Sequence, residues 1–130
     1  MTRRRVQISP SLEDYLEAVL ELSSDDQGAR TTDIATKLDV SKASVNQAVG
    51  LLVGRHLVTR EKYGPIFLTD EGVAAAQTIR KRHEAIKSFL TNVLGVSEAI
   101  AEEDACRIEH VVSAKTMASM IDYMDKRTSL

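Results

Sequence analysis

The feature that most constrains the fold of this chain is a change of hydrophobic periodicity near Gly54. Before it, apolar residues at helical spacing predict a short helix capped by Thr32 that runs through Leu38. A second helix, from Lys42 to about Val53, is expected with Ser41 as its cap, and the tight connection Asp39-Val40-Ser41 joins the two. After it, residues 57–68 alternate like two short strands around a turn at Gly64-Pro65. Two short helices, a tight turn and a β-ribbon, in that order, are typical of a winged helix-turn-helix.

Four further helices are expected, each after a serine or threonine that can cap it. They are predicted over residues 12–22, 70–94 and 98–112 and from residue 114 onward, with Ser11, Thr69, Ser97 and Ser113 as caps. The last two leave more apolar surface than a winged helix needs, so a homodimer is expected. Its seam is predicted at Met117, Met120, Ile121 and Met124.

Composition excludes several classes of protein. The chain has 130 residues, 43% of them hydrophobic and 28% charged, which is ordinary for a globular domain. A single cysteine rules out a disulfide framework within the chain. No apolar run reaches the length of a membrane span, and no apolar signal core follows the basic start Arg3-Arg4-Arg5. A cytoplasmic protein without a membrane partner is therefore expected.

The net charge of −2 excludes a wholly basic nucleic-acid binder but allows a locally basic one. The second short helix would enter the major groove of DNA, and the wing would lie beside the phosphate backbone. The residues predicted to contact DNA are Lys42, Ser44, Asn46 and Gln47 on the helix and Arg60 and Lys62 in the wing. The alternative is a polar solvent face on a protein-interaction module.

A second constellation has the residue types of a metal site. Cys106, Glu109 and His110 stand at i, i+3 and i+4, so on a helix they share one face. His83 occupies a slot in the apolar stripe of the long helix, between Ile79 and Ile86. The alternatives are a buried cysteine beside a solvated pair, and a core histidine. Two acidic residues on one face of the first helix, Asp14 and Glu17, are a weaker pair, and taken alone they are better explained as a solvated acidic face.

Two segments resemble a known family. Asp104-Ala-Cys-Arg-Ile-Glu-His-Val-Val-Ser113 resembles the metal-binding helix of the diphtheria-toxin-repressor (DtxR) family, and Ser11-Leu-Glu-Asp-Tyr-Leu-Glu17 resembles the opening helix of its manganese-transport-regulator (MntR) branch. The resemblance runs from about Pro10 to Met124. It implies a mainly α fold with a small β-wing, in which a winged helix-turn-helix DNA-binding domain (residues 1–70) precedes a helical metal-binding and dimerisation domain (residues 71–130). The implied function is metal-activated repression by a homodimer on a double-stranded DNA operator.

The resemblance also implies a ligand set. Asp14 and Glu17 match carboxylates of the manganese branch, and Cys106 matches the iron branch. Lys87 stands where the iron branch has a glutamate of an ancillary site, which makes that site doubtful here. The metal site implied by the resemblance comprises Asp14, Glu17, His83, Cys106, Glu109 and His110. Carboxylate and imidazole ligands with one thiolate suit a divalent transition metal, Fe(II) or Mn(II).

Two other functions are alternatives to metal-activated repression. A metal-independent winged-helix regulator, of the multiple-antibiotic-resistance kind, would lack a convergent ligand set. A small metalloenzyme would need an open coordination position in a substrate cleft, and the sequence has neither a Gly-rich phosphate loop nor a nucleophile motif. The chain is therefore predicted not to be an enzyme.

Overall fold

The computed structural model describes residues 10–23 and 27–128. The basic segment Arg3-Arg4-Arg5, and residues 24–26 of the polar turn between the first two helices, lie outside this range. The chain divides between Ala76 and Gln77 into two compact units. Within the described residues, no helix combines the length and the apolar character needed to cross a lipid bilayer.

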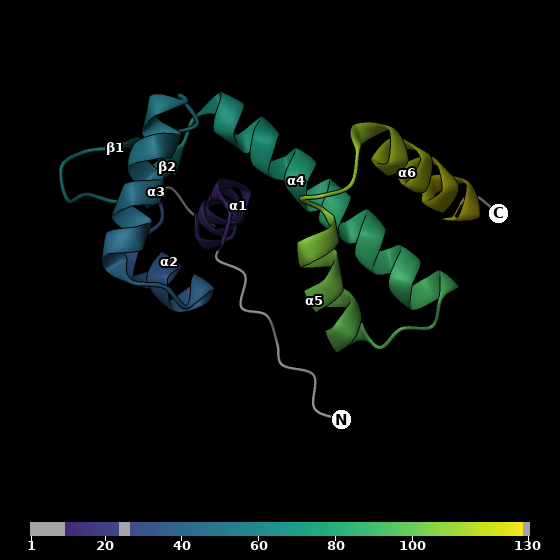
Figure 1. Cartoon of the computed structure of the whole chain (residues 1–130). Coiled ribbons are helices and arrows are strands. Elements are labelled where there is room, and N and C mark those ends of the chain that lie inside the picture. The colour runs from purple at the N-terminus through teal and green to yellow at the C-terminus, as the bar shows by residue number, and fades with distance from the viewer. Residues whose placement is uncertain (1–9, 24–26, 129–130) are drawn as a thin grey trace. The chain divides into compact units, whose positions relative to one another are not determined.

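The N-terminal unit has the element order of a winged helix-turn-helix, as predicted. Its elements are α1 (Leu12–Leu22), α2 (Thr31–Leu38), α3 (Lys42–Gly54), β1 (Val58–Arg60) and β2 (Ile66–Leu68), shown from purple to teal in Figure 1. The two strands pair antiparallel, and Ala29 adds an isolated bridge to Ile66 on β2. The core residues contributed by these helices and strands include Leu16, Val19, Ile34, Val45, Val49, Leu52, Val58 and Ile66.

Local side-chain chemistry sets the helix starts that the sequence predicted. Ser11 and Asp14 form a capping box, in which Asp14 N donates to Ser11 Oγ at 3.2 Å and Ser11 N donates to Asp14 Oδ2 at 2.9 Å. Ser41 Oγ likewise accepts from Ser44 N at 3.0 Å and starts α3. The tight turn between α2 and α3 places Asp39 in the left-handed region, with φ of 54°, which aspartate tolerates better than most residues.

Two of the predicted side-chain caps are wrong. Ser97 stands at the N-cap of α5 but makes no side-chain capping bond. Helix α2 begins at Thr31 rather than after Thr32, and its N-cap residue, Arg30, makes no side-chain capping bond. The extended backbone of Arg30 ends the loop that contains the Ala29 bridge to β2. Pairing with the wing therefore fixes the start of this helix.

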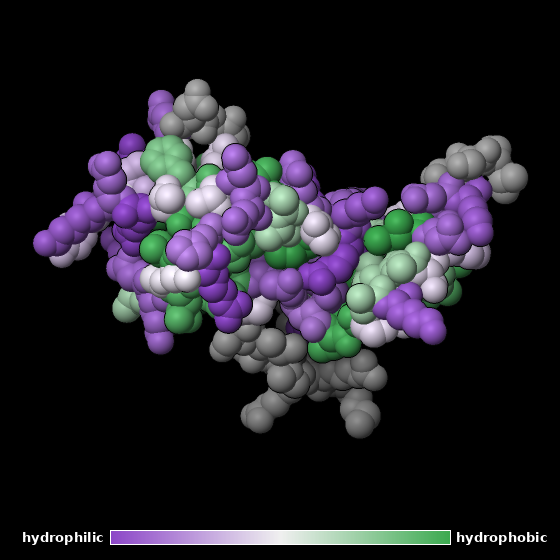
Figure 2. Space-filling model, turned by 90° about the horizontal axis from the view of Figure 1, so that it is seen from above, coloured by the Kyte–Doolittle hydropathy of each residue, from purple (hydrophilic) through white to green (hydrophobic). Residues whose placement is uncertain are grey.

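The C-terminal unit contains most of α4 (Asp70–Ser88), a π-helical segment η1 (Phe89–Val93), α5 (Glu98–Ile108) and α6 (Ala114–Thr128). Its core joins Ile86, Ala105 and Met117, with partly buried apolar residues packed around them. Hydrophilic side chains cover most of the face drawn in Figure 2, and apolar side chains emerge in green between them. The large exposed apolar residues of this unit are Leu94, Ile100, Val111 and Tyr123.

The predicted dimer seam is partly core of the chain itself. Met117 and Met124 are buried, whereas Met120 and Ile121 are partly buried and pack against the same core. The apolar stripe of the last helix therefore packs α6 against its own chain, and only its partly buried residues remain for a partner.

One predicted helix ends earlier than expected, and the long helix changes from α to π before its predicted end. The α-helical part of α4 ends at Ser88, where Thr91 Oγ1 donates to the carbonyls of Lys87 and Ser88 at 3.1 and 3.3 Å and competes for helical acceptors. Helix α5 ends at Ile108, whose carbonyl accepts from both Val111 N and Val112 N. Glu109 and His110 thus lie on a tight turn at the end of α5, rather than inside a helix running to Val112.

A close backbone approach makes Gly72, in the first turn of α4, sensitive to substitution. A Cβ at this position would lie 1.9 Å from the carbonyl oxygen of Leu57. We expect Gly72→Ala to lower the free energy of unfolding by at least ~1–3 kcal/mol, because backbone must move to admit the methyl group. Gly50→Ala is the matched control: its Cβ would meet nothing within 4 Å, so it should raise stability by ~0.5–1 kcal/mol. Urea unfolding of both variants measures the difference, and equal stabilities would contradict this packing.

Candidate metal centre

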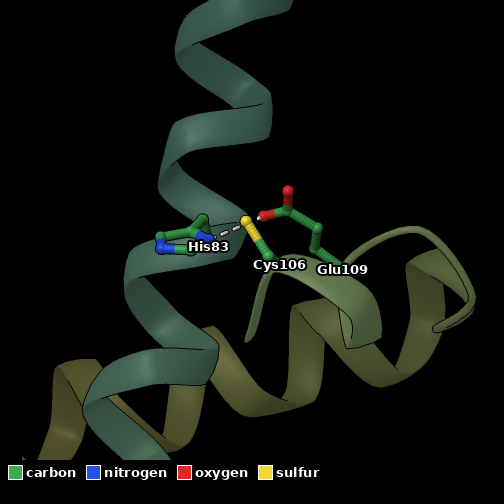
Figure 3. A group of neighbouring side chains, drawn as sticks. All are labelled: His83, Cys106 and Glu109. Carbon is green, nitrogen blue, oxygen red and sulfur yellow. Dashed lines mark ion pairs between the residues drawn. The ribbon is translucent and has the colours of Figure 1, made fainter. Parts of the chain in front are cut away.

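Three donor side chains converge in the C-terminal unit. His83 comes from α4, Cys106 from the last turn of α5, and Glu109 from the turn that follows it. One ligand atom from each lies within 4.8 Å of the other two. Figure 3 shows the imidazole, the sulfur and the carboxylate turned toward one another. Within the C-terminal unit, the structure therefore brings three predicted ligands within reach of one ion, and a fourth, His110, lies against Glu109.

The carboxylate of Glu109 is the least solvated group of the cluster. Glu109 is 1% exposed, and neither of its oxygens has a hydrogen-bond partner. His83 Nδ1 lies 3.2 Å from Glu109 Oε2, and His110 Nε2 lies 3.3 Å from Glu109 Oε1. A buried carboxylate without hydrogen bonds is strongly unfavourable unless a positive charge compensates it. The arrangement fits a divalent cation bound by sulfur, oxygen and nitrogen donors.

The burial of Cys106 and the hydrogen bonding of His83 do not fit the alternative explanations, a buried cysteine and a core histidine. Cys106 is exposed, not buried beside a solvated pair. His83 is 3% exposed, but its Nδ1 makes no hydrogen bond, so it is not a core histidine with both nitrogens satisfied. Both observations favour a ligand cluster over the structural explanations.

The second ring nitrogen of His83 has its own partner. Nε2 lies 2.9 Å from Glu102 Oε1, and Glu102 Oε2 lies 3.0 Å from Lys87 Nζ. The sequence patterns described above predict no role for Glu102 at the metal site. The available signal was its position one helical turn before Cys106, combined with a lysine one turn after His83.

These contacts shift the ionisation of the residues involved. The close approach of Cys106, and then of Glu109, raises the pKa of His83 from 6.5 to about 11, although burial opposes the rise. Burial alone would raise the pKa of Glu102, but its bonds to His83 and Lys87 outweigh burial and lower it. The bond to Glu102 raises the pKa of Lys87.

Asp14 and Glu17 lie on α1 in the N-terminal unit, where both are partly buried. One oxygen of Asp14 serves the capping box of that helix. Their participation in the metal site stays a prediction.

The residues predicted to contact DNA divide into two groups. Lys42, Ser44, Asn46 and Gln47 are exposed on α3, as a recognition surface requires. Lys62 is exposed in the wing, with its Nζ 5.7 Å from the centre of the Tyr63 ring.

Arg60 is engaged within the protein. Its guanidinium donates to Gly64 O at 3.1 Å, to Asn46 Oδ1 at 2.7 Å and to Thr31 Oγ1 at 2.7 Å. The bond to Gly64 lies within the wing, and the bonds to Thr31 and Asn46 fasten the wing to the starts of α2 and α3. No local sequence pattern indicates this role, because Asn46 and Thr31 are 14 and 29 residues away along the chain.

A winged helix-turn-helix followed by a helical unit with a cation-type donor cluster defines a metal-responsive DNA-binding regulator. Residues 7–66 match the N-terminal DNA-binding domain of the iron-dependent repressors, and residues 69–129 match their metal-binding and dimerisation domain. The chain belongs to this family, which includes DtxR and MntR. The family consists of DNA-binding transcriptional regulators and not of enzymes, so the prediction that this chain is not an enzyme is confirmed.

Individual relatives agree with this placement. The chain is 33% identical over 120 residues to an uncharacterised HTH-type transcriptional regulator of Methanocaldococcus jannaschii, covering 92% of this chain and 96% of the relative. It is 38% identical over 106 residues to the transcriptional regulator MntR of Escherichia coli O157:H7, covering 82% and 68% of the two chains.

The fold is shared with solved structures. The structure of the manganese regulator SloR superposes with a TM-score of 0.80 at 30% identity, covering 91% of this chain and 55% of SloR. The chain thus spans about half the length of that protein. The crystal structure of T. acidophilum IdeR has a TM-score of 0.77 at 24% identity, covering 92% of this chain and 56% of IdeR, and supports the fold alone.

The raised pKa of His83 predicts its charge in metal-free protein. A folded-state pKa of about 11 against 6.5 means that this group stabilises the fold fully below pH 6.5, and that this contribution is lost as the pH rises through about 11. In chelator at pH 8, nitrogen chemical shifts should therefore report an imidazolium at His83. Glu109→Gln should lower this pKa, because it removes a negative partner. A neutral His83 ring at pH 8 in the wild type would contradict the geometry.

Proposed function

We propose that the chain is a homodimeric repressor, activated by Fe(II) or Mn(II), that binds a double-stranded DNA operator. The observation that carries this proposal is the buried Glu109 carboxylate, unbonded beside His83 and Cys106, in a chain whose α3 presents a polar face. A regulator of the chromosome acts where the DNA lies, which for this chain we propose is the cytoplasm.

The proposed ligands are His83, Cys106, Glu109 and His110 of the C-terminal unit, together with Asp14 and Glu17 of α1. When bound, the ion would supply positive charge beside the buried Glu109 carboxylate, in place of the His83 proton. Carboxylates and imidazoles suit Mn(II) and Fe(II), while the sulfur of Cys106 favours softer borderline ions. Intrinsic affinity would rank Zn(II) and Cu(II) above both, so the supply of metal in the cell selects the activator.

The proposed switch is a linkage between metal and DNA binding. Asp14 and Glu17 belong to the helix that packs against α2 and α3, and the remaining ligands belong to the other unit. Ligation by both units at once would fix the DNA-reading unit relative to its dimer partner. Only one spacing of two recognition helices fits successive major grooves, so metal strengthens DNA binding, and DNA tightens metal binding by the same factor.

Dimerisation has support in the family match of residues 69–129. Because Met117 and Met124 are buried in the chain's own core, we propose that the partner surface uses exposed apolar residues of this unit instead. Sedimentation of the metal-loaded chain as a monomer at micromolar concentration would contradict a homodimer.

Substitutions should separate metal binding from its coupling to DNA. His110→Ala and Glu109→Gln should abolish metal activation, because each strips a ligand from a small set. Asp14→Asn keeps an oxygen for the capping box and removes the charge, so it should retain part of the metal affinity and lose the response of DNA binding. Glu13→Gln, a charge change in the same helical turn, is the control. Isothermal titration paired with DNA binding measures both properties.

Exchange of the sulfur ligand should shift metal preference. Cys106→Glu replaces a soft donor with a hard one, so the variant should respond more strongly to Mn(II) relative to Fe(II). The measurement is the half-activating concentration of each ion for DNA binding under anaerobic conditions. An unchanged ratio of the two concentrations would remove Cys106 from the ligand set.

The DNA-facing residues should differ in what they contribute. Gln47→Ala should weaken binding to the selected operator by ~1–3 kcal/mol if its amide reads a base, and should leave binding to random DNA unchanged. Arg60→Ala should weaken binding to all sequences, because the wing loses three bonds that hold it. Lys62→Ala should reduce the salt dependence of binding without altering the wing. Intact DNA binding in all three variants would contradict the recognition-helix assignment.

The metal-independent alternative has a direct test. DNA selected from a random library, with and without Mn(II) or Fe(II), supplies the operator. Wild-type protein that binds this operator equally well in chelator would end the proposal of metal activation.

A further inference from the structure

The two nitrogens of the His83 ring face different surroundings. Nδ1 faces the donor cluster and lies 3.2 Å from Glu109 Oε2. Nε2 faces away from Cys106 and Glu109 and lies 2.9 Å from Glu102 Oε1. A neutral imidazole carries its proton on one nitrogen only, so the partner of one nitrogen decides which of them has a free lone pair.

Glu102 is suited to hold that proton on Nε2. A carboxylate accepts and cannot donate, so an imidazole bonded to it through Nε2 must place its hydrogen there. Metal-binding histidines commonly donate their second N–H to a carboxylate, which fixes the tautomer and the orientation of the ring. We propose that Glu102 is a positioning residue that presents Nδ1 of His83, rather than Nε2, to the metal. This inference rests on the proposed metal-binding function.

Lys87 explains why Glu102 stays in place. The Glu102 side chain is 51% exposed, and an isolated carboxylate on a helix surface would sample several rotamers. Lys87 Nζ lies 3.0 Å from Glu102 Oε2 and 3.5 Å from Glu98 Oε1, so an ammonium sits between the two carboxylates. One oxygen of Glu102 thus contacts Lys87 and the other contacts His83. The relay runs from Lys87 through Glu102 to His83.

The Lys87 ammonium also gives the Glu102 carboxylate a counter-charge of its own. Glu102 therefore needs no metal ion to compensate it, in contrast to Glu109, whose oxygens have no hydrogen-bond partner. On this basis Glu102 acts through His83 and does not ligate.

The experiment uses the full chain with Zn(II) and Mn(II) as probes. Zn(II) is diamagnetic, so long-range proton–nitrogen correlations report which nitrogen of His83 is bound to metal and which carries hydrogen. Competition with a chelator dye gives the affinity for each ion. The variants are Glu102→Ala, Glu102→Gln and Lys87→Met, and Glu103→Gln on the same helix is the matched control. Circular dichroism confirms that each variant is folded.

In the wild type we expect metal on Nδ1 and hydrogen on Nε2. Glu102→Ala should weaken metal binding by about 10–100-fold and broaden or shift the Nε2–H signal. Glu102→Gln retains an oxygen that accepts from Nε2–H and should restore most of the affinity. Lys87→Met should weaken binding less than Glu102→Ala does and should add little to it in the double variant, because both act along one relay. Glu103→Gln should match the wild type.

Three results would overturn the inference. Unchanged affinity and unchanged Nδ1 ligation in Glu102→Ala would show that Glu102 orients nothing. Equal loss in Glu102→Gln and Glu102→Ala would show that the carboxylate charge is required and that Glu102 ligates. Metal bound through Nε2 in the wild type would reverse the assignment. A wild type that binds neither ion would overturn the proposed function as well. If any of the three results occurs while metal-dependent DNA binding is normal, only the role of Glu102 and Lys87 is rejected.

Discussion

The C-terminal unit is organised around one unfavourable group, the carboxylate of Glu109. Burying a charge without hydrogen bonds costs several kcal/mol in a protein interior unless a counter-charge is near. Here the counter-charges available from the chain are two imidazoles, those of His83 and His110, at 3.2 and 3.3 Å. The tight turn that ends α5 at Ile108 places Glu109 against α4, and the core of Ile86, Ala105 and Met117 keeps the two helices together. Apolar packing thus holds a buried carboxylate between two imidazoles, at the place where we propose that a cation binds.

Helix starts were predictable from the sequence where a single side chain decides them. Ser11 and Ser41 cap α1 and α3 as expected, because their hydroxyls need only a backbone N–H three residues ahead. The start of α2 was not predictable, because pairing between Ala29 and Ile66 outweighs the local preference of Thr32. The switch from α4 to η1 depends on a threonine hydroxyl bonding back to the helix, and the apolar stripe carries no mark of it.

The candidate site shows the same division. His83, Cys106 and Glu109 could be proposed from residue type and spacing, and the structure brings them together. Glu102 could not, because a glutamate on an acidic helix reads as solvated surface until its partner on another helix is known. Arg60 illustrates the converse case: its charge suggests a phosphate contact, and two of its three internal hydrogen bonds, those to Asn46 and Thr31, depend on partners distant in sequence.

The capping box of α1 ties two properties of the chain to one side chain. Asp14 Oδ2 accepts from the backbone of Ser11, so the residue that we propose as a ligand also secures the first turn of its helix. A substitution that retunes the choice of metal at this position therefore changes the cost of folding α1 at the same time. A methionine at position 14 would keep the bond from its backbone N–H to Ser11 Oγ and lose the bond from Ser11 N, so a change of metal preference at this position also changes the stability of α1.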